Sequence, residues 1–218
     1  MLLQDVWRLF EQRLFSAKAP PRQFNLYRDR HDAHDLPEAP AIRRANLKNY
    51  LACYNVRPPL LLVAEAPGPW GCRFSGVPFT SEAQLVDPAF PIDGRPSSTE
   101  TVPHKEYSGG IYWRVLQPYF PHFFTWNSVP FHPHQAGEPL SVRNPTRREV
   151  AAHEALLRDV LAVLHPERTA AIGRKAERAL QAVGAECTYV RHPSQGGARK
   201  FEAGIREILH ALALKPAA

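Results

Sequence analysis

Short apolar runs alternate with longer amphipathic stretches along this chain. The runs that are short enough for strands buried on both faces are 60–63, 122–126, 168–172 and 187–190. The stretches that read as amphipathic helices are 1–15, 43–55, 110–117, 146–164, 174–183 and 201–212. Strands that alternate with helices favour a parallel sheet covered on both faces. We therefore expect an α/β fold, a three-layer α/β/α sandwich around a four-stranded parallel sheet.

The 218 residues are enough for a single α/β domain, 1–218, with a substantial core. We expect the N-terminal helix and the proline-rich segment within 1–59 to pack on this domain. That segment contains the run HDAHD, His31 to Asp35, which offers metal ligands but is more typical of a solvated loop. A second proline-rich connection, 83–109, is long enough to suggest a functional loop.

Composition narrows the class of protein. Hydrophobic residues make up 44% of the chain and charged residues 22%, as in ordinary soluble globular proteins. Lys and Arg total 27 against 21 Asp and Glu, which gives a net charge of +6. This excess suggests a polyanionic partner, with nucleic acid first, although many basic proteins bind none.

The cysteines indicate a reducing environment. The three of them, Cys53, Cys72 and Cys187, have neither the number nor the spacing of a disulfide framework or a zinc site. We expect no metal and no cofactor, and a cytoplasmic location. No apolar run approaches about 18 residues, and Asp5 and Arg8 interrupt the N-terminal apolar residues, so we expect neither a membrane span nor a signal peptide.

The stretch from Leu60 to Glu82 is the most informative part of the sequence. Its apolar run stops at Glu65, and the Ala-Pro-Gly-Pro that follows cannot continue a strand or open a helix in the ordinary way. Gly68, Gly71 and Gly76 leave room for a close approach of the backbone to a ligand. A polar, glycine-rich loop after a buried strand is where open α/β sheets bind their ligands.

Two later strands also end in polar residues, Asn127 and His192. Since the carboxyl ends of parallel strands share one edge of a sheet, we expect Glu65, Asn127 and His192 to face one cleft. Glu65 could orient a water or pair with an arginine, and Asn127 could read the edge of a base or shape a turn. Together with Phe79 as a stacking surface and the cationic loop from Arg191 to Lys200, they suit a pocket for a nucleobase flipped out of DNA.

These residues carry a resemblance to the uracil-DNA glycosylase superfamily. The motif AEAPGPWGCRFSGVPF (64–79) resembles the Gly-Glu-Ala-Pro-Gly motif of the thermostable family 4 and, in its second half, that of the single-strand-selective branch. WNSVPFHP (126–133) resembles the strand end that bears the family asparagine, and HPS (192–194) resembles the second conserved signature. NPTRREV (144–150) and AIGRKA (171–176) are similar to connecting segments, so that the resemblance covers about 60–210.

The resemblance implies a monofunctional glycosylase of DNA base-excision repair that hydrolyses the N-glycosidic bond of uracil or a related deaminated base. It implies catalytic roles for Glu65 and His192, with His192 stabilising the negative charge that grows at the base O2. The substrate-binding residues would be Ala66, Pro67, Gly68, Gly71, Phe79 and Asn127. The DNA-binding residues would be Ser81, Arg191, Ser194, Gln195, Arg199 and Lys200. The expected partner is DNA that contains such a base, bound by a monomer in the bacterial nucleoid.

The chain departs from the family pattern at two places. Branches that orient the attacking water with an Asp or Asn carry it at the position of Ala66, so the role of the adjacent Glu65 is open. Family 4 holds an iron–sulfur cluster through four cysteines, and Phe131 and His153 stand at two of the matching positions. We therefore expect no cluster, with Phe131 in the core instead.

Hydrolysis is favoured over lyase chemistry because the sequence shows no lysine at a strand end, where it could form a Schiff base. The nearest candidate is Lys200. Two alternatives stay open. One is a nucleic-acid-binding relative without catalytic activity, suggested by Ala66, and the other is a glycosylase for hypoxanthine or xanthine.

Overall fold

A four-stranded parallel sheet lies at the centre of the computed structural model, which describes residues 3–217. Its strands are β2 (Leu60–Ala64), β3 (Phe123–Asn127), β5 (Arg168–Ile172) and β6 (Thr188–Val190). They lie in the order β3-β2-β5-β6, and each neighbouring pair is parallel. The predicted sheet is confirmed, and each predicted strand agrees with the structure to within one residue at either end.

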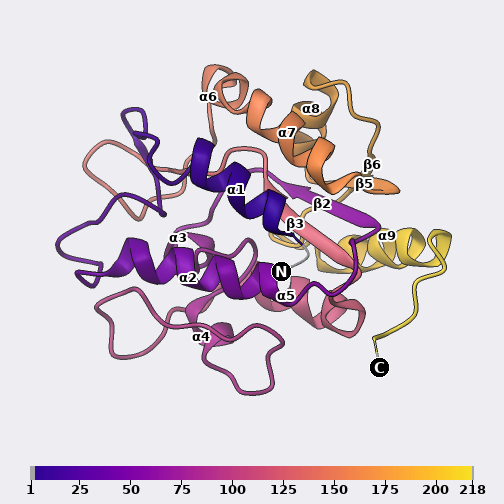
Figure 1. The fold of residues 1–218 in the computed structure, drawn as a ribbon, viewed down its shortest axis with the longest axis horizontal. Coiled ribbons are helices and arrows are strands. Elements are labelled where there is room, and N and C mark those ends of the chain that lie inside the picture. The colour runs from indigo at the N-terminus through magenta and orange to yellow at the C-terminus, as the bar shows by residue number, and fades with distance from the viewer. Residues whose placement is uncertain (1–2, 218) are drawn as a thin grey trace.

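Helices cover both faces of this sheet (Figure 1). On one side lie α7 (Glu154–Leu164) and α8 (Arg174–Ala182), and on the other lie α5 (Tyr107–Leu116) and α9 (Ala198–Ala211). The three-layer α/β/α architecture is therefore confirmed. A short 3-10 helix, η1 (Gln117–Tyr119), follows α5.

The helix predicted over 146–164 is two helices, because the chain breaks at His153 between α6 (Arg147–Ala152) and α7. The predicted start of α6 is confirmed by two reciprocal hydrogen bonds. The Glu149 backbone N–H donates to Thr146 Oγ1 at 3.2 Å, and the Thr146 N–H donates to Glu149 Oε2 at 2.6 Å.

The N-terminal segment packs on the sheet through α1 (Gln4–Arg13) and α2 (Ala39–Ala52). The first two residues of the predicted helix 1–15 lie outside the described residues, and α2 begins four residues before the predicted helix 43–55. The Phe10 ring of α1 stacks on Trp126 of β3, with the ring centroids 4.2 Å apart. A two-stranded antiparallel ribbon joins β1 (Gln23–Phe24) to β4 (His132–Pro133) just after β3. The first part of the chain is thus attached to the segment that follows Asn127.

A buried ion cluster joins this segment to α2 and to the short helix α3 (Cys72–Ser75). Asp35 lies between two arginines: its Oδ2 is 2.9 Å from Arg43 Nη2 and 3.0 Å from Arg73 Nη2. All three side chains are fully buried. The expectation that the run His31 to Asp35 is a solvated loop is therefore wrong for Asp35, because two guanidinium groups compensate its charge inside the protein.

Glu82 adds a second buried carboxylate beside the ion cluster, at the start of α4 (Glu82–Leu85). It accepts hydrogen bonds from the Ser97 and Ser98 backbone N–H groups at 2.6 and 2.9 Å. Ser81, predicted to contact DNA, is buried and is the N-cap of the same helix. Its backbone N–H donates to Gln84 Oε1 at 2.9 Å. A contact between the Ser81 side chain and DNA stays a prediction.

Candidate active site

A cavity of about 700 Å³ opens at the carboxyl ends of the parallel strands. Each strand contributes to it: Glu65 follows β2, Asn127 ends β3, Lys175 follows β5 and His192 follows β6. The parallel topology thus brings together the three strand ends that the sequence placed in one cleft. The predicted residues that line the cavity are Glu65, Ala66, Gly68, Phe79, Asn127, Arg191, His192, Ser194 and Gln195.

Phe79 forms an aromatic surface of the cavity. Its ring stacks on Tyr112 of α5, with centroids 4.5 Å apart and planes within 4°, and it lies 5.6 Å from the His192 ring. Its backbone has φ = 54°, a left-handed conformation that is uncommon for a residue with a side chain. Gly109 permits it, because a Cβ at that position would lie 2.5 Å from the Phe79 carbonyl oxygen. Strain of this kind is concentrated at functional sites.

Asn127 is buried at the end of β3, in register with Ala64 of β2. Its Nδ2 donates a long hydrogen bond, 3.7 Å, to Cys72 Sγ. A thiol sulfur is a weak acceptor, so a substrate carbonyl could replace it at little cost. The amide is therefore held in place while its hydrogen-bonding capacity remains available to a ligand.

His192 has a defined protonation state. The Ser194 backbone N–H donates to His192 Nδ1 at 3.2 Å, and Ser194 Oγ lies 2.8 Å from the same nitrogen. Because a backbone N–H can only donate, Nδ1 is an acceptor, and we infer that the neutral ring carries its proton on Nε2. Burial, aided by the charge of Arg191, lowers the pKa of His192 to about 4. The sequence alone did not decide whether His192 acts as a neutral hydrogen-bond donor or as a cation. The structure favours the neutral donor at pH 7.

Glu65 is partly exposed and ion-paired. Its Oε1 lies 3.1 Å from Lys175 Nζ, at the start of α8. Burial raises the pKa of Glu65 above its ordinary value, and the hydrogen bond and charge of Lys175 limit that rise. The inference that no lysine stands at a strand end is wrong, because Lys175 follows β5 and lines the cavity.

A second carboxyl group, Glu106, reaches the cavity from the residue before α5. Ser108 Oγ donates to its Oε1 at 3.1 Å. Burial raises the pKa of Glu106. Within residues 3–217, no lysine, arginine or histidine forms an ion pair with it. Glu106 lies in the connection 83–109, for which the sequence suggested a functional loop.

Two predicted substrate-binding residues serve the cavity indirectly. Pro67 is buried, and its carbonyl oxygen accepts a hydrogen bond from His132 Nδ1 at 2.8 Å. Gly71 is covered by Glu106, because a Cβ at position 71 would lie 2.1 Å from Glu106 Oε2. Neither residue lines the main cavity, and direct contact of these two residues with the substrate stays a prediction.

The cationic loop is shorter than predicted. Helix α9 begins at Ala198, so Arg199 and Lys200 stand on its first turn and not in a loop. The loop itself turns through left-handed residues, with φ = 51° at Gln195 and 72° at Gly196. Arg191 Nη1 donates to the His192 carbonyl oxygen at 3.2 Å, which fixes this arginine beside the catalytic candidate.

Sequence reasoning missed Lys175, Glu106 and Cys72 as parts of the cavity. Lys175 could have been found, since it follows a predicted parallel strand just as Glu65 does. Glu106 follows no strand, and no spacing in the sequence relates it to the glycines of the 65–76 loop. Its place in the cavity is a tertiary feature.

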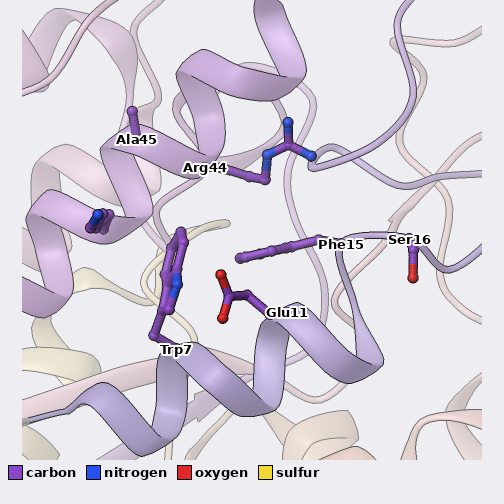
Figure 2. Close-up of a pocket in the computed structure, with 7 residues that line it drawn as sticks. Trp7, Glu11, Phe15, Ser16, Arg44 and Ala45 are labelled. Carbon is purple, nitrogen blue, oxygen red and sulfur yellow. The ribbon is translucent and has the colours of Figure 1, made fainter.

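A second hollow lies between α1 and α2, away from the strand ends (Figure 2). It is lined by Trp7, Glu11, Phe15, Ser16, Arg44, Ala45 and Lys48. Lys48 Nζ lies 5.7 Å from the centroid of the Trp7 ring, and Arg44 lies 6.0 Å from that of Phe15. These cation–aromatic contacts hold the two helices together. None of the predicted site residues lies in this hollow.

The residues present do not fit the cluster of family 4. The chain has three cysteines, fewer than the four thiolates such a cluster takes. Phe131 is buried as predicted, and its ring meets His153 edge-on at 4.9 Å. Within residues 3–217, no group of three His, Cys, Asp or Glu side chains is arranged to hold a metal ion. In the same range, no helix is long and apolar enough to span a membrane.

In this α/β/α domain an aromatic ring, an amide and a histidine line one cavity at the edge of the sheet where α/β proteins bind their ligands. Comparison with known protein families identifies the family of this chain. The chain belongs to the uracil DNA glycosylase superfamily, whose family profile matches residues 52–213. The predicted resemblance is confirmed, and it gives the protein the general role of a DNA glycosylase that acts on DNA in repair.

A solved structure agrees with this fold. The crystal structure of wild-type SMUG2 from Pedobacter heparinus is similar, with a TM-score of 0.66 and 17% sequence identity over 97% of each chain. No curated protein matches the chain at a significant level.

Proposed function

We propose that this protein is a monofunctional DNA glycosylase that hydrolyses the N-glycosidic bond of uracil, or of a related deaminated base, flipped out of DNA. The observation that carries this proposal is a cavity that holds His192, Asn127 and Phe79 together, with His192 oriented by the Ser194 N–H on its Nδ1. We also propose that it works as a monomer in the bacterial cytoplasm, at the nucleoid.

The proposed chemistry assigns one task to each side chain. Phe79 stacks on the extruded base, and Asn127 hydrogen-bonds its edge. His192 Nε2–H donates to the carbonyl oxygen of the departing base, where negative charge develops as the glycosidic bond breaks. A neutral donor is suited to this task because it is already oriented by Ser194 and needs no proton from solution.

Glu65 is the proposed water-orienting group, since Ala66 has no polar side chain. Its pairing with Lys175 favours the ionised carboxylate, which can accept a hydrogen bond from the attacking water. The same pairing supports hydrolysis over lyase chemistry, because an ammonium engaged by a carboxylate is a poor nucleophile. Arg191, Ser194 and Gln195 are proposed to contact the DNA backbone.

An excision assay tests this proposal. The protein is incubated with single- and double-stranded oligonucleotides that contain uracil, hypoxanthine or xanthine, and alkaline cleavage reveals abasic sites. We expect excision that His192→Ala abolishes and His210→Ala, an exposed histidine on α9, leaves intact. Borohydride should trap no covalent complex; a trapped complex that Lys175→Met removes would establish a lyase instead.

One observation favours a second candidate, a relative that binds nucleic acid without catalysis. Ala66 leaves the position of the water-orienting side chain empty of polar atoms. Binding of DNA without excision of any of the three bases would support this candidate over the enzyme. Excision of a purine alone would keep the mechanism and change the base assignment.

A further inference from the structure

The carboxyl group of Glu106 lies in the wall of the cavity, where it has lost part of its hydration. It lines the same cavity as Phe79, Asn127 and His192. Within the described residues it has no cationic partner, and its one hydrogen-bond donor is Ser108 Oγ, 3.1 Å from Oε1. Burying a carboxyl group without a counter-charge destabilises a fold, so an arrangement of this kind is typical of a functional group.

Glycines create the space for this side chain. A Cβ at Gly71 would lie 2.1 Å from Glu106 Oε2, and one at Gly68 would lie 3.1 Å from Oε1. A Cβ at Gly109 would lie 3.3 Å from Oε2. Three backbone positions from two separate segments are therefore free of side chains around one carboxyl group. The carboxyl group is held against the glycine-rich loop.

The position of Glu106 places it at the base-reading end of the cavity. Cys72 is the common neighbour: its sulfur accepts from Asn127 Nδ2 at 3.7 Å, and the charge of Glu106 raises the pKa of the thiol, after the larger effect of burial. Glu65, in contrast, is paired with Lys175 of α8. The two carboxyl groups therefore have different neighbours, and Glu106 shares its neighbour Cys72 with the Asn127 amide.

We propose that Glu106 is a specificity-determining residue, whose carboxyl group donates a hydrogen bond, beside Asn127, to the carbonyl oxygen that deamination has put in place of an amino group on the flipped base. This inference deepens the proposed function and depends on the base occupying the same cavity. It extends the recognition of the base from one side chain to two.

The chemistry of the pair explains the choice of base. The Asn127 amide contains both a donor and an acceptor, so it can form a hydrogen bond with either an amino or a carbonyl group. A protonated carboxyl presents an O–H donor, which is complementary to a carbonyl oxygen. Burial raises the pKa of Glu106, which favours this protonated form. A donor held by the fold discriminates more strongly than an apolar surface, because the mismatched base leaves it unpaired.

Binding measurements test this inference apart from catalysis. The probes are two oligonucleotides with uracil or cytosine as the target base, each with a 2′-fluorine on the target sugar to block cleavage. We expect the native protein to bind the uracil probe more tightly. Glu106→Leu should reduce the ratio of uracil to cytosine affinity about tenfold. Glu106→Gln, which retains an N–H donor, should keep this ratio within about threefold of the native value.

Two further variants separate recognition from stability. Gly71→Ala should place a methyl group where the Glu106 carboxyl lies and so narrow the uracil–cytosine difference in a folded protein. Added to Glu106→Leu, it should have no further effect on that difference. Glu100→Leu, an exposed carboxylate on the same connection, is the matched control and should change nothing.

The outcomes distinguish this inference from the proposed function. Loss of discrimination in Glu106→Leu, in a protein that never releases a base, would support the inference and reject the proposed enzyme. The inference would be overturned, and the proposed enzyme kept, if the native protein excises a base and Glu106→Leu does not change the ratio of the two affinities. This holds whether Glu106→Leu weakens the binding of both probes by the same factor or leaves both affinities unchanged. Equal native affinity for both probes would also overturn it.

Discussion

Two groups of ionisable side chains in this protein differ in how completely they are paired. In the ion cluster of Asp35, Arg43 and Arg73, both oxygens of the carboxylate meet guanidinium nitrogens. Arg43 also donates to the Leu26 carbonyl oxygen at 2.8 Å. Among residues 3–217, Ser108 is the one side chain that donates to the Glu106 carboxyl group, and the hydrogen bonds that fix His192 Nδ1 do not involve its Nε2–H.

This difference separates architecture from chemistry. Burial lowers the pKa of Arg43 to about 10, yet Asp35 keeps it charged. Burial would also raise the pKa of Asp35, but the hydrogen bond from Arg73 and the two arginine charges outweigh it and lower the pKa. Glu106 and His192 lack such compensation, and burial shifts their pKa toward the neutral forms. The paired charges of the ion cluster therefore hold the fold together, whereas these two groups keep hydrogen-bonding capacity for a ligand.

The largest expected effect is on stability, from Asp35→Ala. Removing the carboxylate leaves two guanidinium groups buried without a counter-charge, so the free energy of unfolding should fall by about 3–5 kcal/mol. Urea denaturation measures this. Asp32→Ala, with a side chain 89% exposed in the same run of sequence, is the control and should change stability little. A loss below about 1 kcal/mol for Asp35→Ala would contradict the contrast drawn above.

The next effect is on catalysis, from His192→Ala. Loss of the donor to the departing base should slow excision about 10²- to 10³-fold in single-turnover assays. The free energy of unfolding should stay the same or rise, because a half-buried group that faces a cavity is removed. If this variant loses stability as Asp35→Ala does, His192 belongs with the structural group.

Acid should destabilise the fold through buried histidines. Burial lowers the pKa of His132 to about 4, against about 6.5 in the unfolded chain. The unfolded state then binds the proton first, so stability is complete above about pH 6.5 and falls as the pH drops toward 4. For His132 the loss between pH 7 and pH 4.5 should be about 2 kcal/mol. His132→Asn should show a smaller loss in urea denaturation at the two pH values; an identical loss would refute this origin.

The smallest effect concerns the ion pair of Glu65 and Lys175. With side chains 29% and 41% exposed, this pair is screened by water, so its removal should cost less than about 1 kcal/mol. In Lys175→Met the pKa of Glu65 should rise, because the hydrogen bond and the positive charge are both lost. The acid limb of the excision profile should move to higher pH, whereas Lys175→Arg should leave it in place. An unchanged limb in Lys175→Met would show that excision does not need the Glu65 carboxylate.

The sheet and its edge could be predicted because the physics is local. Runs such as 60–63 and 168–172 are apolar throughout, which is typical of strands buried on both faces, and the parallel direction follows from the intervening helices. Glu65, Asn127 and His192 then lie at one edge of the sheet because the strands that they follow or end are parallel. The same rule applied to the strand 168–172 would have found Lys175.

Other features could not be predicted from any local pattern. The ribbon of β1 and β4 has two residues in each strand, too few for a periodic signal. Gly197, the residue before α9, lies so close to the His192 carbonyl oxygen that a Cβ there would be 2.0 Å away, and this tertiary contact has no sequence signal. Glu106 and the glycines around it come from two segments, and only the folded chain relates them.

The neutral state of His192 has a consequence for the effect of ionic strength. Binding of DNA by Arg191 and its neighbours releases counterions, so added salt weakens the encounter with DNA. A hydrogen bond from an uncharged, half-buried ring is screened less by salt than a contact between two charges. Added salt should therefore lower the affinity of the protein for DNA and leave the excision rate of the bound DNA nearly constant.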